Sequence, residues 1–250
     1  MIIWISSYPK SGNTWIRFFI ISLLLGTKEK IGLKLLENIQ QFPNKSQYDR
    51  LKITDLNYKN LNHISKYWIT AQNLINLDKR IRFFKTHNAL CKVDNNIFTN
   101  EENTLGAIHI VRDPRNVITS LNNHYHHNNF NDSKNFIFDE RKGIFNKSKI
   151  KANYALPQII GSWRTHYLSW KILKKNYLLI KYENLVEKPN YEFRKIADYL
   201  EILLKKKFSD NQVFEAVKFS SFENLKSMEE KDGFSESVVN PKTKKREKFF

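Results

Sequence analysis

Four short apolar runs most constrain how this chain can fold. They are Ile2–Ser6, Ile81–Lys85, Gly106–Val111 and Tyr177–Tyr182, and stretches with helical periodicity separate them. Short, almost continuously apolar strands are typical of a parallel sheet that is covered on both faces. The alternation therefore predicts an α/β fold with three layers, a mostly parallel central sheet and helices on both faces.

Helices are predicted where apolar residues recur at helical spacing. The predicted helices are Asn13–Leu25, Asn116–His127, Pro157–Lys174, Tyr191–Leu203 and Asn211–Phe219. Two stretches have a weaker pattern: we expect irregular helix and loop over Thr27–Tyr67, and a long mobile excursion over the polar Asn128–Tyr154. No internal repeat or clean boundary appears, so we expect a single domain over residues 1–250.

The chain is strongly basic. Its 250 residues carry 42 Lys and Arg against 25 Asp and Glu, a formal net charge of +17. Such an excess favours an anionic partner, which could be nucleic acid, an acidic membrane surface or a polyanionic small molecule. The abundant Lys, Asn, Ile, Phe and Tyr all have A/T-rich codons, so a compositional origin for part of the charge stays open.

The single cysteine, Cys91, excludes a disulfide within the chain and favours a reducing, cytoplasmic setting. Met1 leads directly into an apolar strand, so we expect no signal peptide. The run Trp15–Leu25 is too short to span a bilayer and contains Arg17, so we expect a buried helix and no transmembrane segment.

The stretch SSYPKSGNTW, at residues 6–15, joins the first strand to the first helix. Because Asn13 begins that helix, free backbone N–H groups near Gly12 and the helix dipole together predict an anion site. The spacing differs from the G-x-x-x-x-G-K-[ST] loop of ATP-binding proteins, because Lys10 and Ser11 precede Gly12. The spacing therefore counts against an ATP loop and leaves open which anion this loop binds.

Further polar residues surround this loop. Lys10 adds a full charge, and Ser11 and Thr14 add hydroxyl donors. Trp15 could offer a flat face to a nucleotide base or could be a core aromatic, and the two interpretations are about equally supported.

The second and third strands also end in polar residues. Strand alternation places Lys85 and His87 on one side, and histidine is the usual base for a hydroxyl near neutral pH. Arg112 ends the third strand and can bind a phosphate through its fork of donors, with Ser120 one or two helical turns later. The alternatives are a purely structural histidine and a surface ion pair between Arg112 and Asp113.

Five motifs, in order along the chain, resemble those of the sulfotransferases that use 3′-phosphoadenosine 5′-phosphosulfate (PAPS). That family carries Y-P-K-S-G-T-T-W, K-T-H, R-x-P-x-D-x-x-x-S, Y-E-D-L and T-S-F-x-x-M. The matching stretches are Tyr8–Trp15, Lys85–His87, Arg112–Ser120, Tyr182–Leu185 and Ser220–Leu225. Asn13, Asn116 and Ser220 depart from the pattern, where the family has Thr, Asp and Thr.

The resemblance implies a P-loop-like fold, a metal-independent transfer and a role for each matched residue. Lys10 would hold the bridging oxygen of the 5′-phosphosulfate, Lys85 would neutralise the sulfonate, and His87 would take the acceptor's proton. Arg112 and Ser120 would bind the 3′-phosphate. The loop residues Ser11, Gly12, Asn13 and Thr14 would bind the remaining oxygens, and the adenine would be surrounded by Trp15, Tyr182, Ser220 and Phe222. Ser221 would also belong to the cofactor site.

The same resemblance implies a late Arg-Lys-Gly clamp on the 3′-phosphate and then a G-x-x-G-x-x-K run. The sequence ends at Lys248-Phe249-Phe250, before either motif. The basic residues between Lys242 and Lys248 could fold over the 3′-phosphate as a substitute, or could be solvated; a short terminal nucleic-acid site is a weaker interpretation.

We therefore expect a PAPS-dependent sulfotransferase that releases 3′,5′-ADP and acts on a small-molecule, carbohydrate or lipid acceptor, with no nucleic acid as partner. One alternative is a P-loop nucleotide kinase in which Asp113 holds magnesium. Another is an RNA- or polyanion-binding protein on the same fold. A metal at the histidine cluster His124–His127 is disfavoured, because no acids or cysteines lie at ligand spacing.

Overall fold

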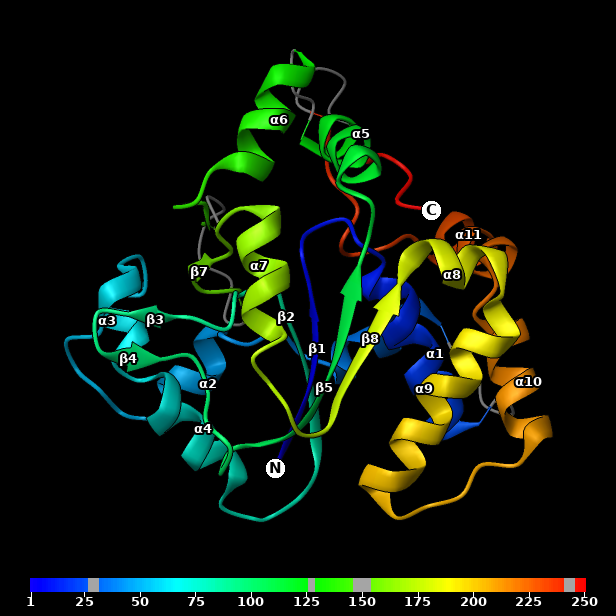
Figure 1. Ribbon diagram of the computed structural model, residues 1–250, viewed down its shortest axis with the longest axis horizontal. Helices are drawn as coiled ribbons and strands as arrows, with labels where there is room; N and C mark the ends of the chain where they lie inside the picture. The colour runs from blue at the N-terminus through cyan, green and yellow to red at the C-terminus, as the bar shows by residue number, and fades with distance from the viewer. Residues whose placement is uncertain (27–31, 126–128, 146–153, 241–245) are drawn as a thin grey trace.

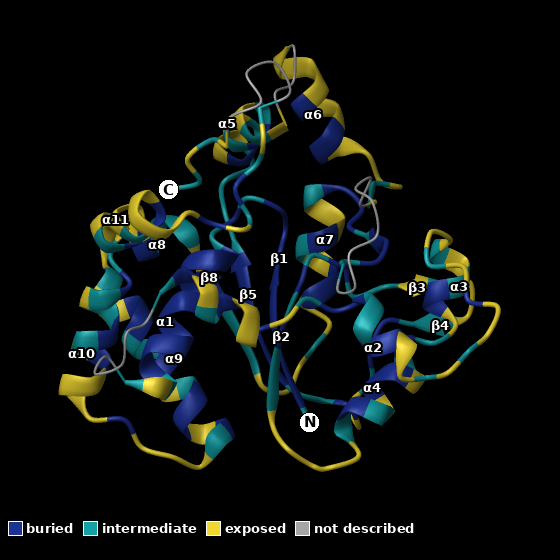
Figure 2. Ribbon diagram, turned by 180° about the vertical axis from the view of Figure 1, so that it is seen from behind, coloured by how far each residue is buried: buried dark blue, intermediate teal, exposed yellow. Residues whose placement is uncertain are grey.

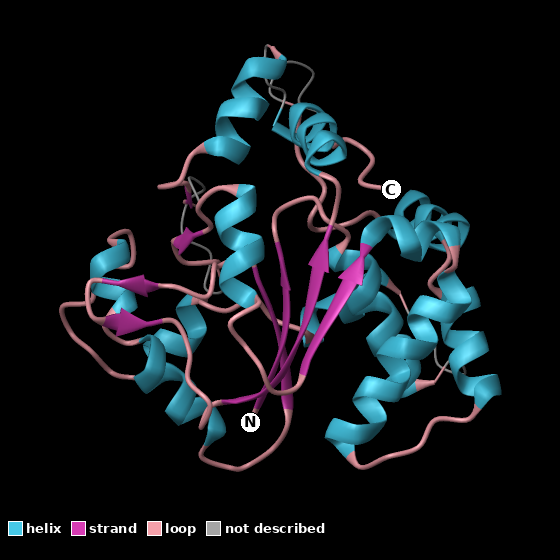
Figure 3. Ribbon diagram, viewed as in Figure 1, coloured by secondary structure: helices cyan, strands magenta, loops and turns pink. Residues whose placement is uncertain are grey.

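Four parallel strands form the central sheet (Figure 1, and magenta in Figure 3). Their order across the sheet is β2 (Arg82–Thr86), β1 (Ile2–Ser7), β5 (Thr104–Val111) and β8 (Tyr177–Lys181). The computed structural model describes residues 1–26, 32–125, 129–145, 154–240 and 246–250. The predicted α/β class and parallel sheet are confirmed.

One face of the sheet packs against a large helical layer. Ile3 and Ile5 of β1 point into this side, as the alternation of a strand requires. The helices that contribute to it are α1 (Asn13–Leu25), η1 (Leu33–Asn38), α8 (Tyr182–Glu187), α9 (Pro189–Leu204), α10 (Asp210–Phe219) and α11 (Phe222–Asp232).

The opposite face carries a second core, centred on Trp4 of β1. Trp4 is fully buried and contacts the rings of Phe42, Phe84 and Phe98. This layer comprises α2 (Lys45–Asp49), α3 (Leu61–Ser65), α4 (Trp68–Asn76), α7 (Trp163–Trp170) and a small antiparallel pair, β3 (Lys92–Val93) with β4 (Asn96–Ile97). Figure 2 shows the central strand β1 as buried, whereas the edge strands β2 and β8 are mostly intermediate. Because a core lies on each face of the sheet, the sheet is the middle layer of three.

A third, smaller cluster lies beyond the carboxyl ends of the strands. It is built from α5 (Pro114–Tyr125), α6 (Phe130–Phe138) and the short pair β6 (Gly143–Ile144) with β7 (Gln158–Ile159). Tyr8, which follows β1, anchors the cluster: its hydroxyl donates to the carbonyl oxygen of Phe136 at 3.1 Å. The cluster therefore packs directly onto the loop that follows β1.

The topology places the carboxyl end of β1 near the middle of the edge at which all four strands end. From β1 the chain continues to β2 on one side and then to β5 on the other, so the strand order diverges at β1. The register pairs Ser6 with Thr86, Ser7 with Ile110, and Val111 with Lys181, so all four strands end at the same edge. Ligands of doubly wound sheets bind in the crevice at such a point.

Three predicted elements need correction. The helix expected over Pro157–Lys174 is only α7, because residues 158 and 159 form β7 and the Ser162 side chain caps the helix by accepting from the Thr165 N–H. The excursion expected over Asn128–Tyr154 contains α6, which is capped by the Asn129 side chain; residues 128 and 146–153 lie outside the described residues. The strand expected to reach Tyr182 ends one residue earlier, where α8 begins.

The other expectations agree with the structure. The predicted helices near α1, α5, α9 and α10 are present, although residues 126 and 127 fall outside the described part. The described portion of Thr27–Tyr67 holds only short helices, as expected. In the described part of the chain, no helix has both the length and the apolar character needed to cross a bilayer.

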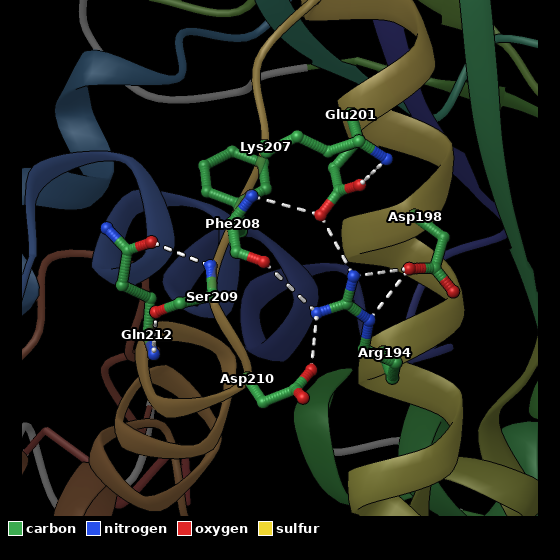
Figure 4. Close-up of polar contacts among 8 residues, drawn as sticks. All are labelled: Arg194, Asp198, Glu201, Lys207, Phe208, Ser209, Asp210 and Gln212. Atoms are coloured by element: carbon green, nitrogen blue, oxygen red, sulfur yellow. Dashed lines mark hydrogen bonds and ion pairs between the residues drawn. The ribbon is translucent and has the colours of Figure 1, made fainter.

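The connection between α9 and α10 is held by a dense polar network (Figure 4). The Arg194 guanidinium contacts Asp198 at 2.7 Å, Glu201 at 2.9 Å and Asp210 at 3.2 Å. The Glu201 carboxylate also accepts from the backbone N–H of Phe208 at 3.0 Å. This network fixes the turn that brings α10 back against α1.

Candidate active site

A cavity of about 890 Å³ opens at the carboxyl edge of the sheet. This volume falls in the range that small-molecule sites occupy. Its walls come from the loop after β1, the first turn of α1, the ends of β2 and β5, the start of α8 and the C-terminal segment. The predicted site residues that line it are Lys10, Gly12, Asn13, Thr14, Trp15, Lys85, His87, Arg112, Ser120, Tyr182 and Phe222.

The loop after β1 has an unusual backbone. Lys10 has φ 64° and Gly12 has φ 98°, both in the left-handed region. A Cβ on Gly12 would lie 2.6 Å from Cδ2 of Tyr182, so glycine is needed both for the turn and for the close approach of this ring. No side chain caps α1, and no acidic residue stands in its first turn. Its N-terminal N–H groups are therefore suited to an anion.

Lys10 brings a positive charge to this loop without a matching carboxylate. Its Nζ lies 3.4 Å from Nδ1 of His124 and 4.2 Å from the centre of the Phe249 ring. Burial and the charge of Arg112 lower the pKa of Lys10 to about 8. Within the described part of the chain no ion pair joins Lys10 to an acidic side chain, so a bound anion would stabilise its charged form.

Lys85 lies on the other side of the loop and has a carboxylate partner. Its Nζ donates to Oε1 of Glu236 at 2.6 Å, and the same carboxylate contacts Arg17 at 2.8 Å. Burial, and then the charge of Arg17, lower the pKa of Lys85 to about 8. The prediction that Lys85 and His87 share one side of the strand end agrees with their common place on the cavity wall.

His87 is held in one tautomer. Its Nδ1 lies 2.8 Å from the carbonyl oxygen of Ser7, which can only accept, so the proton of the neutral ring resides on Nδ1. Its backbone N–H donates to Oε1 of Gln158 at 2.9 Å. Burial and the charge of Lys85 lower the pKa of His87 to about 4, so the ring is neutral at physiological pH. Nε2 then carries a free lone pair, which is the requirement for a base.

Arg112 is fixed at the end of β5 by three contacts. One guanidinium nitrogen donates to the carbonyl oxygen of Lys10 at 3.0 Å, and the group stacks over the Tyr182 ring at 4.3 Å. Its own carbonyl accepts from Nε1 of Trp163 at 3.1 Å. The Nε atom is buried with no partner. The alternative of an Arg112–Asp113 surface pair does not apply, because Asp113 pairs with Arg115 instead.

An aromatic wall lies beside Arg112. Trp15 meets the rings of Tyr182 and Phe222 edge-on, at 6.1 Å and 5.3 Å between centroids. Trp15 is only 8% exposed and its Nε1 donates to the carbonyl oxygen of Ser220 at 2.7 Å. It therefore belongs mainly to the core and shows only an edge to the cavity.

Four of the side chains predicted to bind the cofactor do not present their polar groups to the cavity. The Ser220 hydroxyl donates to carbonyl oxygens of α10, and the Ser221 hydroxyl caps α11. The Asn13 amide donates to the carbonyl oxygen of Ile5 at 3.0 Å, so it ties the loop to β1 although the residue lines the cavity. The Ser11 hydroxyl is buried without a partner and lies outside the cavity lining.

Several lining residues were not predicted from the sequence. Glu236, Phe249 and Phe250 come from the C-terminal segment, and Arg17 comes from the buried face of α1. A charged residue inside the apolar run of α1 was the one available signal, because a fully buried arginine needs a partner. Nothing in the sequence placed Glu236 beside it.

Only part of the basic tail and part of the histidine cluster lie among the described residues, and those parts build neither of the sites considered for them. Lys248 pairs with Glu230, and Arg246 donates to the carbonyl oxygens of Phe234 and Ser237, so neither lines the cavity. Residues 126, 127 and 241–245 lie outside the described part. Within that part, no group of three or more His, Cys, Asp or Glu side chains could hold a metal ion.

Comparison with known proteins identifies the class. The model of the sulfotransferase domain family matches residues 2–249, so the chain belongs to that family. Luciferin sulfotransferase from Photinus pyralis is 24% identical over 223 residues, and cytosolic sulfotransferase 13 from Arabidopsis thaliana is 22% identical over 230 residues. The alignments cover 89% and 90% of this chain but only 56% and 62% of those proteins.

Solved structures agree at the level of the fold. Mouse sulfotransferase SULT7A1 complexed with PAP superposes with a TM-score of 0.55 at 21% identity, over 90% of this chain and 66% of that one. Retinol dehydratase in complex with androsterone and inactive cofactor PAP gives a TM-score of 0.57 at 19% identity, over 91% and 66%. The predicted P-loop-like sulfotransferase fold is thereby confirmed.

Proposed function

We propose that this chain transfers a sulfonate group from PAPS to an acceptor hydroxyl or amine and releases 3′,5′-ADP. The observation that carries the proposal is the convergence of Lys10, Lys85, Arg112 and neutral His87 on one cavity, at the uncapped N-terminus of α1. Membership of the sulfotransferase family supports it, as do the PAP complexes of the structurally similar proteins.

The donor would lie along the loop after β1. The N–H groups at the start of α1 and the Lys10 ammonium would hold the 5′-phosphosulfate, where the geometry leaves a positive charge without a carboxylate. Arg112 and Ser120 would hold the 3′-phosphate, because both line the cavity and match the family motif that binds it. The adenine would lie between Tyr182 and Phe222, against the edge of Trp15.

His87 would act as the general base. Nε2 would accept the proton of the acceptor hydroxyl while the acceptor oxygen bonds to sulfur and the bond from sulfur to the bridging phosphate oxygen breaks. The leaving oxygen takes up negative charge, which Lys10 and Lys85 would stabilise. Hydrogen bonding of Nδ1 to the Ser7 carbonyl oxygen would stabilise the imidazolium that forms.

The acceptor would enter from the side of the cavity lined by α6 and the β6–β7 pair. The described residues there are mainly apolar, and they include Phe136, Ile144, Phe145 and Leu156, with Lys142 above the Phe136 ring at 4.4 Å. A small apolar or aromatic alcohol fits this lining. Retinol dehydratase, which has the same fold, was solved with androsterone.

The kinase alternative has weaker support. It needs a carboxylate beside the loop to hold magnesium, and Asp113 was the candidate. The Asp113 carboxylate pairs with Arg115 and is not part of the cavity lining. Glu236 is the one carboxylate among the described lining residues, and it is already paired with Arg17 and Lys85. Metal-independent transfer therefore remains our proposal, with a chelator as its check.

The test is transfer of labelled sulfonate from PAPS to a panel of phenols, alcohols, sterols and sugars. We expect His87→Ala to lower the rate about a hundredfold or more, with nearly unchanged affinity for 3′,5′-ADP, because only proton removal is lost. The matched control is His63→Ala on α3, remote from the cavity. Near-normal turnover of His87→Ala would exclude the base assignment, and loss of transfer on adding a chelator would favour a metal-dependent reaction.

A further inference from the structure

The segment after α11 places the carboxylate of Glu236 in the cavity proposed to bind PAPS. It turns at Gly233, with φ 70°, and buries Phe234. The Glu229 carboxylate accepts from the Ser237 hydroxyl at 2.6 Å and from the backbone N–H groups of Phe249 and Phe250 at 2.8–3.0 Å. Glu236, one residue before Ser237, is thereby held over the first turn of α1.

Glu236 contacts three donors of the cavity wall. Its carboxylate accepts from Lys85 at 2.6 Å, from Arg17 at 2.8 Å and from the Thr14 hydroxyl at 3.2 Å. Arg17 is 2% exposed and has no other carboxylate partner in the described part of the chain. Glu236 is 29% exposed, so it remains accessible from the cavity while it bridges the two cations.

The charges around Lys85 explain why this contact matters. The groups that face it are Arg17 of α1, His87 after its own strand, and Glu236, with Lys10 across the cavity. Glu236 is the one acidic side chain among the described lining residues. Desolvation alone would raise the pKa of Glu236, but Arg17 and Lys85 hold it below its usual value. The carboxylate is therefore ionised throughout the pH range in which Lys85 titrates.

We propose that Glu236 is a positioning residue of the donor site, whose carboxylate holds Lys85 beside His87, compensates Arg17 and so keeps Lys85 available as a cation. This proposal rests on the proposed function, because sulfonate transfer is what gives the charged Lys85 its role. An ammonium has three N–H donors, so Lys85 can keep its bond to Glu236 while it donates to a sulfonate oxygen. Glu236 thus acts through Lys85 and does not itself touch the transferred group.

The charge state of Lys85 can be measured without any substrate. Competitive acetylation between about pH 6 and pH 11, followed by peptide mapping, gives the midpoint at which each lysine loses its proton. The mapping separates Lys85 from Lys10, which titrates in the same range. We expect a midpoint of about 8 for Lys85 in the unmodified protein.

Glu236→Gln should lower that midpoint by about one pH unit or more, because it removes the negative charge and leaves the cationic neighbours in place. Glu236→Asp keeps the charge and should give a midpoint between the two. The matched control is Glu230→Gln, which removes an exposed charge of α11 that pairs with Lys248. It should leave the Lys85 midpoint unchanged.

The outcomes are distinct. An unchanged Lys85 midpoint in Glu236→Gln would overturn the proposal, whatever the protein binds. A lowered Lys85 midpoint would support the proposal if, in the same variant, transfer activity also begins to decline at a lower pH on the alkaline side. If the unmodified protein fails to bind 3′,5′-ADP, the proposed function fails instead. A loss of activity of equal size at every pH would indicate a merely structural role and would also overturn it.

Discussion

At the connection between α9 and α10, three carboxylates surround the single guanidinium of Arg194. In the cavity at the end of β1 the ratio is reversed, and cations outnumber carboxylates. Among the described residues that line it, one carboxylate, Glu236, stands against five cations: Lys10, Arg17, Lys85, Arg112 and Lys142. The first cluster satisfies its own charges, and the second leaves positive charge unsatisfied.

This difference separates a structural network from a binding site. An arginine with carboxylate and carbonyl partners gains nothing from a ligand, and removing it costs stability. Desolvated cations with too few counter-charges are destabilising by themselves, and they are stabilised by an anion that enters from solvent. The comparison predicts that charge removal has opposite consequences at the two places.

The largest effect is expected at Lys10. Lys10→Met keeps the length of the side chain and removes the charge, so we expect the affinity for 3′,5′-ADP to fall about tenfold to a hundredfold. The melting temperature should stay the same or rise, because a desolvated cation is lost. Calorimetric titration and thermal unfolding measure the two quantities. The control is Lys226→Met, an exposed lysine of α11. A Lys10→Met protein with a lower melting temperature and an unchanged affinity for 3′,5′-ADP would contradict the distinction between the two regions.

A smaller and opposite effect is expected at Arg194. Arg194→Met leaves the nearly buried Glu201, whose side chain is 6% exposed, with Lys207 as its one charged partner among the described residues. We expect the melting temperature to fall by about 2–4 °C. The affinity for 3′,5′-ADP should not change. Arg115→Met is the control, because that side chain is 87% exposed and pairs with one carboxylate; its melting temperature should not move. Weaker nucleotide binding in Arg194→Met would show that the two regions are not independent.

The parts of the site that could be predicted from the sequence are local. The loop around Gly12, the strand end at Lys85 and His87, and Arg112 each follow an apolar strand, and parallel strands end at one edge. Side-chain direction was harder to predict. The Ser220 hydroxyl matches a family motif, yet it donates within its own helix, because a helix end offers it carbonyl oxygens at short range.

Long-range contacts carried too little sequence signal. Glu236 lies 151 residues after Lys85 and 219 after Arg17, in a segment without periodicity. Helix α6 was missed because its polar surroundings hide a short apolar face, of which Phe136 and Ile137 pack below Tyr8. The cytoplasmic location, the single-domain organisation and the absence of a metal remain predictions of the sequence.

The central claim, that the cavity is a donor site for a 3′-phosphorylated nucleotide, is tested most directly by one titration series. The ligands are 3′,5′-ADP, 5′-AMP, ATP with and without magnesium, and a short RNA, each added to the unmodified protein. We predict that 3′,5′-ADP binds without metal and at least about tenfold more tightly than 5′-AMP, because Arg112 and Ser120 line the cavity and are the residues we assign to the 3′-phosphate. Tighter binding of magnesium-ATP would contradict the account and favour the kinase. Preference for RNA over 3′,5′-ADP would contradict it and favour a polyanion-binding protein.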